Sequence, residues 1–181
     1  MKPREIKTGV YSAGAVDWDR RLFDALIPLP DGTSYNSYLI RGSEATALVD
    51  TVDDTMAGVL LDNLDGLGIK DIDYVIANHA EQDHSGSLPC VLDKFPRAKL
   101  VTTEKCRGML IDLLGIKPEV FITVADGETI SLGDRTLEFV HAPWVHWPET
   151  MLTYLREEKI LFPCDLFGSH LATTDLYVRD E

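Results

Sequence analysis

Two histidines and two acidic residues lie within six consecutive positions of the chain: His79, Glu81, Asp83 and His84. Imidazole nitrogens suit zinc, copper, iron and nickel, and each added carboxylate shifts the preference toward harder cations. Two imidazoles and two carboxylates at this density exceed what one tetrahedral ion would share. The run therefore predicts ligands for two adjacent metal ions.

The alternative interpretation of this run is a polar turn, in which Asp83 or Ser85 caps the following helix and the histidines are solvated. That interpretation suits a single histidine in most sequences. It suits four spaced ligand types poorly, so the metal site is the favoured prediction.

Further candidate ligands follow strands that lie later in the chain. His146 stands between Trp144 and Trp147, after a strand that closes at His141, and Asp165 follows another apolar strand. Alone, each residue is uninformative, because a histidine between tryptophans is often packed and an aspartate after a strand often forms a turn. Their shared position at strand ends makes them candidates, with His141 as a further one.

The secondary structure expected around the candidate ligands predicts that they lie at the edge of a sheet. Residues 72–77 form an apolar strand that ends at the ligand run, and residues 85–89 have the composition of a helix start. Loops at the carboxyl ends of strands converge on a crevice in open α/β sheets, and sites are found there. We therefore expect the ligands at the carboxyl edge of a sheet.

The remaining pattern predicts a mixed α/β sandwich, because strand pairs come first, β-α-β-α follows and a β meander closes the chain. Hydrophobic periodicity and turn residues give the expected boundaries. Strands are expected at residues 36–41, 45–52, 72–77, 99–102, 121–124, 128–132, 136–141, 151–155 and 159–163, and helices at 56–67, from 85 to about 95, and 104–114.

Charge argues against several classes of partner. The 181 residues include 17 basic and 30 acidic side chains, which give a formal net charge of -13. Such a field repels phosphate backbones and anionic lipid surfaces, so we expect neither nucleic acid nor membrane as a partner. No apolar run reaches membrane-spanning length, and no long apolar stretch follows the basic amino terminus to make a signal peptide.

The cysteines are few and scattered: Cys90, Cys106 and Cys164. An odd count without close pairing argues against a disulfide framework and for a reducing compartment, so we expect a cytoplasmic protein. Cys90 and Cys106 lie in apolar helical stretches and are expected in the core. Cys164 adjoins a candidate ligand, and packing is its expected role.

These motifs resemble the metallo-β-lactamase-like domain of flavodiiron proteins (A-type flavoproteins). The matching features are His-x-Glu-x-Asp-His at 79–84, the His-Trp-Pro-acid segment that begins at His146, and Asp165 after a hydrophobic strand. Dizinc hydrolases of the wider superfamily usually have His where this chain has Glu81, and that exchange agrees with the preference of carboxylates for harder ions. The resemblance runs through nearly the whole chain and implies an αββα sandwich.

The resemblance also implies a set of ligands for two irons. His79, Glu81 and His146 would hold one iron, Asp83 would hold the other, and Asp165 would bridge them. His84 matches a position that binds the second iron in some members and is displaced in others. His141 matches no ligand and is expected to support the ligands or the fold.

The chain departs from the family pattern in several places. Trp144 and Glu149 stand where relatives tend toward Met and Asp. The family takes a last histidine ligand from a downstream segment, and His170 follows Asp165 too closely to supply it. The family's flavodoxin-like FMN domain has no counterpart here, because no phosphate-cradling loop is recognisable. We therefore expect residues 1–181 to be one diiron domain, truncated at its C-terminal end.

The implied function is reduction of O2 to water or of NO to N2O at two irons. In the complete family, electrons come from FMN and a rubredoxin-like donor, and the protein is a homo-oligomer arranged as a head-to-tail dimer. Two alternatives stay open. One is a dizinc hydrolase, in which a zinc-bound hydroxide attacks an ester, amide or thioester. The other is a non-catalytic fragment that only binds metal.

Overall fold

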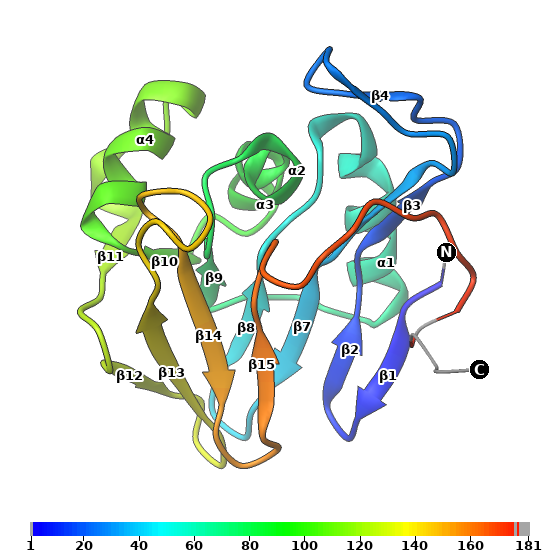
Figure 1. Cartoon of the computed structure of the whole chain (residues 1–181). Coiled ribbons are helices and arrows are strands. Elements are labelled where there is room, and N and C mark those ends of the chain that lie inside the picture. Colours follow the sequence, from blue (N-terminus) through cyan, green and yellow to red (C-terminus); the bar gives the residue numbers. More distant parts are fainter. Residues whose placement is uncertain (1, 176, 178–181) are drawn as a thin grey trace.

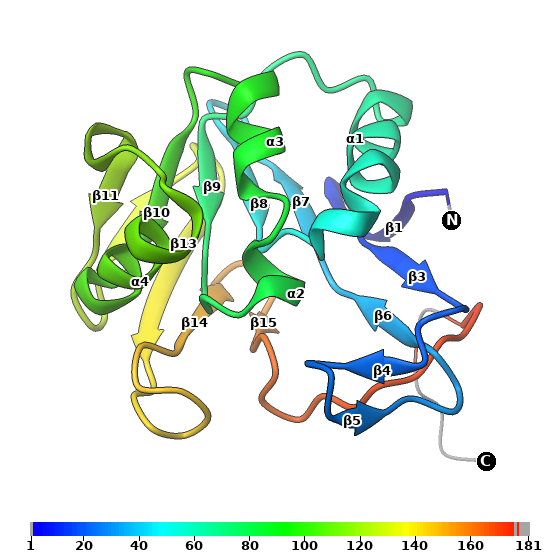
Figure 2. The ribbon, with the colours of Figure 1, turned by 90° about the horizontal axis from the view of Figure 1, so that it is seen from above.

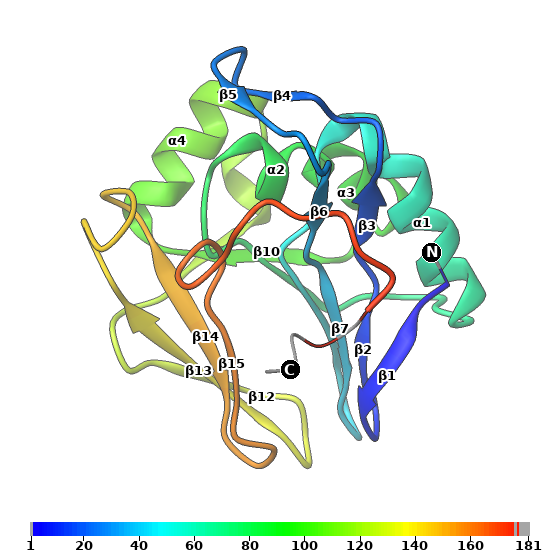
Figure 3. The same ribbon diagram turned by 45° about the vertical axis from the view of Figure 1, so that its right-hand side comes forward.

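The computed structural model describes residues 2–175 and 177. Two β-sheets pack face to face, and helices cover the outer face of the larger sheet (Figures 1 and 3). In this part of the chain no helix covers the outer face of the smaller sheet (Figure 3). The expected mixed α/β sandwich is confirmed, and the described residues form three of the four expected layers.

The larger sheet has seven strands, in the order β1-β2-β7-β8-β9-β10-β11. Strands β8 to β11 run parallel, whereas β1, β2, β7 and β8 pair antiparallel. Helices connect the parallel strands and lie on one face of the sheet (Figure 2). The strands are β1 Arg4–Lys7, β2 Val10–Ser12, β7 Tyr38–Arg41, β8 Thr46–Val49, β9 Tyr74–Ile76, β10 Lys99–Thr102 and β11 Phe121–Thr123, and the longer helices are α1 Ala57–Gly66, α3 Leu88–Lys94 and α4 Glu104–Leu114.

The smaller sheet is an antiparallel meander of four strands, in the order β12-β13-β14-β15. The strands are β12 Thr129–Ser131, β13 Thr136–His141, β14 Met151–Leu155 and β15 Ile160–Phe162. Short 3-10 turns at Asp54–Met56 and Pro118–Val120 belong to the connections of the larger sheet, before α1 and before β11. Because β13 and β15 run in the same direction, the loops that follow them emerge at the same end.

Successive side chains of the parallel strands point to opposite faces of the larger sheet, so they belong to two separate hydrophobic cores. In β8 and β9, Leu48 and Val75 face the helices, whereas their neighbours Val49 and Ile76 face the smaller sheet. All four side chains are fully buried. A strand buried on both faces has this continuous apolar run, which is why the sequence pattern there is easy to interpret.

Four short strands near the amino terminus were not expected from the sequence. β3 Ala15–Asp17 pairs with β6 Thr33–Tyr35, and β4 Leu22–Phe23 pairs with β5 Ile27–Pro28. Each has only two or three residues, which is too short for a recognisable alternation. The β4–β5 hairpin projects beside the segment that follows β15 (Figure 2).

The ligand run itself differs from the expected loop. Residues Gln82–Ser85 form a one-turn helix, α2, and the next helix begins at Leu88 rather than at Ser85. The expectation for Cys90 was wrong, since its position on α3 faces solvent, whereas Cys106 is fully buried as expected. All three cysteines are free thiols.

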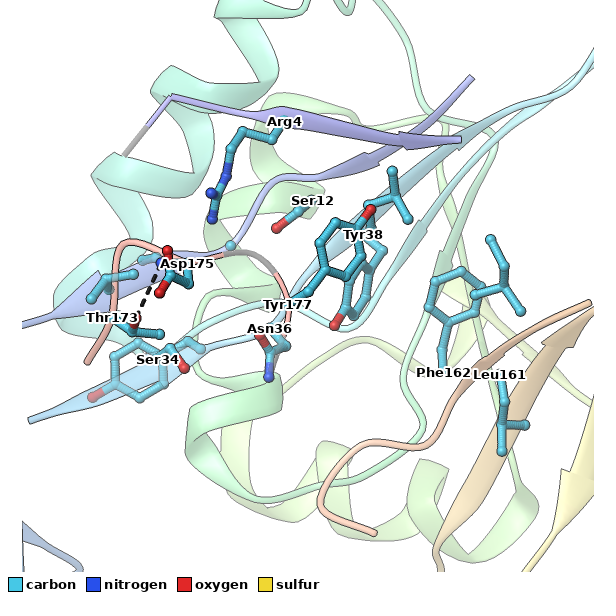
Figure 4. A pocket seen from close by; sticks show the side chains of 16 residues that line it. Arg4, Ser12, Ser34, Asn36, Tyr38, Leu161, Phe162, Thr173, Asp175 and Tyr177 are labelled. Atoms are coloured by element: carbon cyan, nitrogen blue, oxygen red, sulfur yellow. Dashed lines mark hydrogen bonds between the residues drawn. The ribbon is translucent and has the colours of Figure 1, made fainter. Parts of the chain in front are cut away.

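A cavity of about 240 Å³ opens between the two sheets on their β1 and β15 side (Figure 4). Tyr38 and Phe162 form part of its wall, with ring centroids 5.0 Å apart, and Arg4 donates from the same wall to the Thr174 carbonyl. None of the candidate ligands lines this cavity, so it is separate from the predicted metal site. Among the described residues no helix is long and apolar enough to cross a membrane.

Candidate metal centre

The structure brings together all six ligands that the resemblance implies. They form two groups that could each hold an ion, and within each group the ligand atoms lie no more than 4.8 Å apart. Asp165 belongs to both groups. The first group is His79, Glu81, His146 and Asp165, and the second is Asp83, His84 and Asp165.

Three loops at one end of the two sheets deliver these side chains (Figure 1). His79 and Glu81 follow β9, and Asp83 and His84 lie on α2 directly after them. His146 lies in the loop between β13 and β14, and Asp165 follows β15. The predicted position at the carboxyl edge of a sheet is therefore correct, and the smaller sheet contributes from the same end.

Distances in the first group have the scale of a metal coordination sphere. His79 Nε2 lies 3.0 Å from Glu81 Oε2 and 3.4 Å from Asp165 Oδ2. His146 Nε2 lies 3.1 Å from Asp165 Oδ2 and 3.6 Å from Glu81 Oε2. Ligand atoms that each stand about 2.1 Å from one ion, at angles of about 90–110°, are separated by roughly 3.0–3.4 Å. The four side chains therefore fit a single ion.

The second group meets the first at Asp165. His84 Nε2 lies 2.9 Å from Asp165 Oδ1 and 3.5 Å from Asp83 Oδ2. The two oxygens of Asp165 thus face different groups, which is the arrangement that a bridging carboxylate needs. Asp83 Oδ1 is buried and has no hydrogen-bond partner in the described part of the chain, and a cation would satisfy it.

The cluster is buried at its base and open at its mouth. His79 and His84 are nearly inaccessible, whereas the side chains of His146 and Asp165 retain 35% and 28% exposure. Trp147 packs its edge against the His79 ring at 4.9 Å. The centre is therefore open to solvent on the side of His146 and Asp165, and closed at the base, where His79 and His84 lie.

Both buried imidazoles are stabilised in their protonated form. Burial lowers the pKa of His79, but hydrogen bonds to Glu149 and Glu81 outweigh it and raise the pKa to about 9. Burial also lowers the pKa of His84, and its hydrogen bond to Asp165 leads the contacts that raise that pKa well above its ordinary value. Binding of a metal ion must displace these protons, because only a neutral imidazole donates to a metal.

The pKa values of the carboxyl groups in the cluster are shifted in opposite directions. Burial raises the pKa of Asp83 to about 6. Burial also raises the pKa of Asp165, but the hydrogen bond and charge of His84 bring it below its ordinary value. The hydrogen bond from His79 lowers the pKa of Glu81. The cluster thus holds closely coupled charges of both signs, as metal and catalytic sites do.

Glu149 supports His79, a role that the sequence analysis did not assign to it. Its Oε1 accepts a hydrogen bond from His79 Nδ1 at 2.7 Å and another from the Ala80 amide at 3.1 Å. A histidine whose Nδ1–H is held by a carboxylate presents Nε2 to a metal in a fixed orientation. The residue was noted as the acid of the His-Trp-Pro-acid segment and as a departure from the family pattern, and an acid next to a ligand segment is a signal for such support.

Asn78 ties the two sheets together directly beneath the centre. Its backbone N–H donates to Asp50 Oδ1 at 2.8 Å. Its side-chain Nδ2 donates to Asp50 Oδ2 and to the Phe162 carbonyl, each at 3.2 Å. Thr153 donates to Asn78 Oδ1 at 2.7 Å. The fully buried Asn78 thereby links β9 of the larger sheet to β14 and β15 of the smaller one.

Asp50 lies behind the other buried imidazole. It follows β8 with a left-handed backbone (φ 54°), and its Oδ2 lies 3.8 Å from His84 Nδ1. The contact is an ion-pair contact and is longer than a hydrogen bond, and His84 Nδ1 has no hydrogen-bond partner among the described residues. Glu149 and Asp50 are thus a pair of buried carboxylates, one behind each histidine.

The other histidines lie elsewhere. The Nε2 atom of His141 makes a hydrogen bond with the Val124 carbonyl at 3.1 Å. His141 therefore supports the fold, which is one of the two roles expected for it. His170 contacts Thr33 Oγ1 through Nδ1 at 3.0 Å and is no part of either group. Cys164 is half-buried near the Met151 carbonyl, which agrees with packing.

We predict that Glu149→Gln weakens metal binding at the first group about 10- to 100-fold, the usual effect of losing a carboxylate that supports a metal-bound histidine. Isothermal titration with Zn²⁺ measures it. Glu138→Gln is the matched control, because that carboxylate lies on β13 and pairs with Arg156 instead. Equal affinities in the two variants would contradict the assigned role of Glu149.

Comparison with known proteins gives consistent matches. A family model described as "ODP family beta lactamase" matches residues 33–181. The flavodiiron protein from Giardia intestinalis superposes with a TM-score of 0.90 at 39% identity, over 97% of this chain and 42% of that one. Rubredoxin oxygen:oxidoreductase from Desulfovibrio gigas gives a TM-score of 0.89 at 33% identity, over 96% of this chain and 43% of that one.

A curated relative from Moorella thermoacetica, named nitric oxide reductase, is 39% identical over 177 residues, which are 96% of this chain and 44% of the relative. The chain therefore spans less than half the length of each of these proteins. What they share with it is the part that contains the six clustered side chains.

Proposed function

Because the chain belongs to the ODP family of β-lactamase-like domains, the domain of flavodiiron proteins, we propose that it provides a two-iron centre for reducing O2 to water or NO to N2O. The observation that supports this proposal most directly is the donor set. Three carboxylates and three imidazoles converge in two groups that share Asp165. That proportion of carboxylate suits iron better than the softer, nitrogen-rich sets that zinc favours.

In this proposal, His79, Glu81 and His146 would hold the first iron, and Asp83 and His84 would hold the second. Asp165 would serve both, because its two oxygens face different groups. When bound, two adjacent irons supply electrons and a binding position for a diatomic substrate. His84 is assigned as a ligand in this chain, since its Nε2 lies 2.9 Å from the shared Asp165.

The protein's own residues orient the ligands and control access. Glu149 holds the Nδ1 side of His79, so that its Nε2 faces the first metal position, and the Asp50 carboxylate lies 3.8 Å from His84 Nδ1. Trp147 covers the His79 ring and limits water on that side. The half-exposed His146 leaves the mouth open for a small substrate.

Electron supply and assembly belong to the same proposal. By the flavodiiron resemblance, FMN on a flavodoxin-like domain is the proposed source of electrons for the metal centre of residues 1–181. A rubredoxin-like protein is the proposed donor, because the Desulfovibrio gigas relative is named for rubredoxin and oxygen. We propose O2 or NO as the substrate, a homo-oligomeric assembly and a cytoplasmic location, the last supported by three free thiols.

Metal content after anaerobic loading tests this function. We expect about two iron ions per chain and a visible absorption band after oxidation. Zinc with esterase activity would instead support the dizinc hydrolase, and little bound metal of either kind would support a non-catalytic fragment. Either result would overturn the proposal.

We also predict that Glu81→His shifts bound metal toward zinc. The change exchanges a carboxylate that lies 3.0 Å from His79 Nε2 for a softer imidazole. The measurement is the iron-to-zinc ratio by elemental analysis after loading with both ions. Glu119→His, on an exposed 3-10 turn, is the control and should keep the wild-type ratio. An unchanged ratio in Glu81→His would reject this role for the residue.

A further inference from the structure

Asp50 is held in one position behind the metal centre. Its amide donates to the Ile76 carbonyl at 2.8 Å, and its carbonyl accepts a hydrogen bond from Ser37 Oγ at 2.8 Å. Asn78 donates to both of its carboxylate oxygens, through the backbone N–H and through the side chain. The side chain of Asp50 is only 4% exposed. The carboxylate is therefore a fixed, buried negative group.

The main chain of His84 is fixed by the residue that follows Asp50. Both the amide and the hydroxyl of Thr51 donate to the His84 carbonyl at 2.8 Å, and the His84 amide donates to the Glu81 carbonyl at 3.0 Å. On one side of the ring, Nε2 lies 2.9 Å from Asp165 Oδ1. On the other side, Nδ1 lies 3.8 Å from Asp50 Oδ2. The imidazole therefore stands between the shared carboxylate and the fixed one.

The Nδ1 atom of His84 is buried and has no hydrogen-bond partner among the described residues. A neutral imidazole that binds a metal through Nε2 carries its hydrogen on Nδ1. Nδ1 is then a donor in a side chain that is only 7% exposed, and a buried donor without an acceptor is unfavourable. His84 therefore needs an acceptor on this side in order to serve as a ligand.

One water molecule connects the two groups. A separation of 3.8 Å is too long for a direct hydrogen bond, but a water about 2.8 Å from each atom spans it. A cavity of about 190 Å³ reaches Asp50 and provides the room for such a water. Tyr38 and Phe162 line both this cavity and the larger one in Figure 4.

We propose that Asp50 is a positioning residue for the second metal ion. Through one bridging water its carboxylate accepts a hydrogen bond from His84 Nδ1–H, which keeps Nε2 of that ring free of hydrogen and directed at the ion. The inference rests on the proposed function, because it requires a metal ion at the second group. Asp50 touches neither the ion nor a substrate and acts through His84 alone.

Asp50→Asn tests the proposal. Asparagine has the size of aspartate and adopts a left-handed backbone readily, so the fold is kept. If its oxygen accepts from the Asn78 N–H, its amide nitrogen faces His84 and donates where aspartate accepts. That favours the ring tautomer with hydrogen on Nε2, which cannot bind a metal.

The measurement is an anaerobic titration with Co²⁺, followed by visible absorption. The binding step of the second group is identified as the one that His84→Ala removes. In Asp50→Asn the affinity of this step should fall about 10- to 100-fold, and its absorption bands should change. The affinity of the first group should stay that of the wild type, because Asp50 has no contact with its members.

Thr153→Val is the matched control. It removes a buried hydrogen bond to Asn78 from the same polar network but leaves His84 untouched. It should lower the free energy of unfolding and leave both Co²⁺ affinities unchanged. An equal loss at the second group in Thr153→Val, an equal loss at both groups in Asp50→Asn, or wild-type affinities in Asp50→Asn would overturn the inference.

A second measurement needs no variant at Asp50. In the Zn²⁺-loaded wild type, NMR of ¹⁵N-labelled histidine should show a slowly exchanging hydrogen on Nδ1 of His84, assigned by its loss in His84→Ala. A hydrogen on Nε2, or metal bound through Nδ1, would overturn the inference. A wild-type chain that takes up two zinc ions in preference to iron would overturn the proposed function alone. A chain that binds a single ion would overturn both.

Discussion

Asp165→Ala is expected to abolish metal binding at both positions, because Asp165 is the one member that the two groups share. Its Oδ2 lies 3.1 Å from His146 Nε2, and its Oδ1 lies 2.9 Å from His84 Nε2. Loss of a residue that merely supports a ligand costs about 10- to 100-fold in metal affinity, so loss of a shared ligand should cost more than about 100-fold at each position.

His84→Ala is the matched comparison for that variant. It removes a ligand from the second group only, so about one iron per chain should remain. Elemental analysis after anaerobic loading and desalting gives both stoichiometries, and circular dichroism checks that each variant folds. Equal metal retention in the two variants would show that Asp165 is not a bridge.

Asn78→Ala is expected to destabilise the domain by about 3–5 kcal/mol, even without metal. The change leaves Asp50 Oδ2, the Phe162 carbonyl and the Thr153 hydroxyl without their partner in a fully buried position. Each buried polar group left unpaired costs about 1–3 kcal/mol. In a domain of this size, 1 kcal/mol shifts the Tm by about 2–4 °C, so a fall of about 10 °C is expected.

Thermal denaturation followed by circular dichroism measures this effect. Asn36→Ala is the control, because Asn36 is exposed and should alter the Tm by little. A Tm for Asn78→Ala within about 2 °C of the wild type would mean that other contacts hold the two sheets together.

The sequence was most informative where chemistry is concentrated in a few neighbouring positions. His79, Glu81, Asp83 and His84 are adjacent in the chain, so their density alone indicated a metal site. The strands that position them are buried on both faces, and their continuous apolar runs are recognisable. The flavodiiron resemblance and the sandwich fold are confirmed by the comparisons. Coordination of metal by the six residues stays a prediction.

The sequence was least informative about contacts between distant segments. Glu149 lies 70 positions from His79, and no local pattern pairs a carboxylate with one particular imidazole. Asn78 looks like an ordinary turn residue until β15 is seen to bring Phe162 to it. The β4–β5 hairpin was not expected because its strands have two residues each, and elements so short leave no periodicity to detect. Cys90 was misassigned because an apolar stretch does not reveal which side of a short helix faces solvent.

The shared carboxylate also has a mechanical consequence. Asp165 follows β15 of the smaller sheet and meets His84, 81 positions earlier in the chain, beside β9 of the larger sheet. An ion held between them is a reversible cross-link that closes a long loop, and cross-links of this kind reduce the conformational entropy of the unfolded chain. The two sheets cannot separate while the ion stays in place. Loss of the ion and loosening of the sandwich would therefore be coupled events, and we expect a chelator to act on this protein as a selective denaturant.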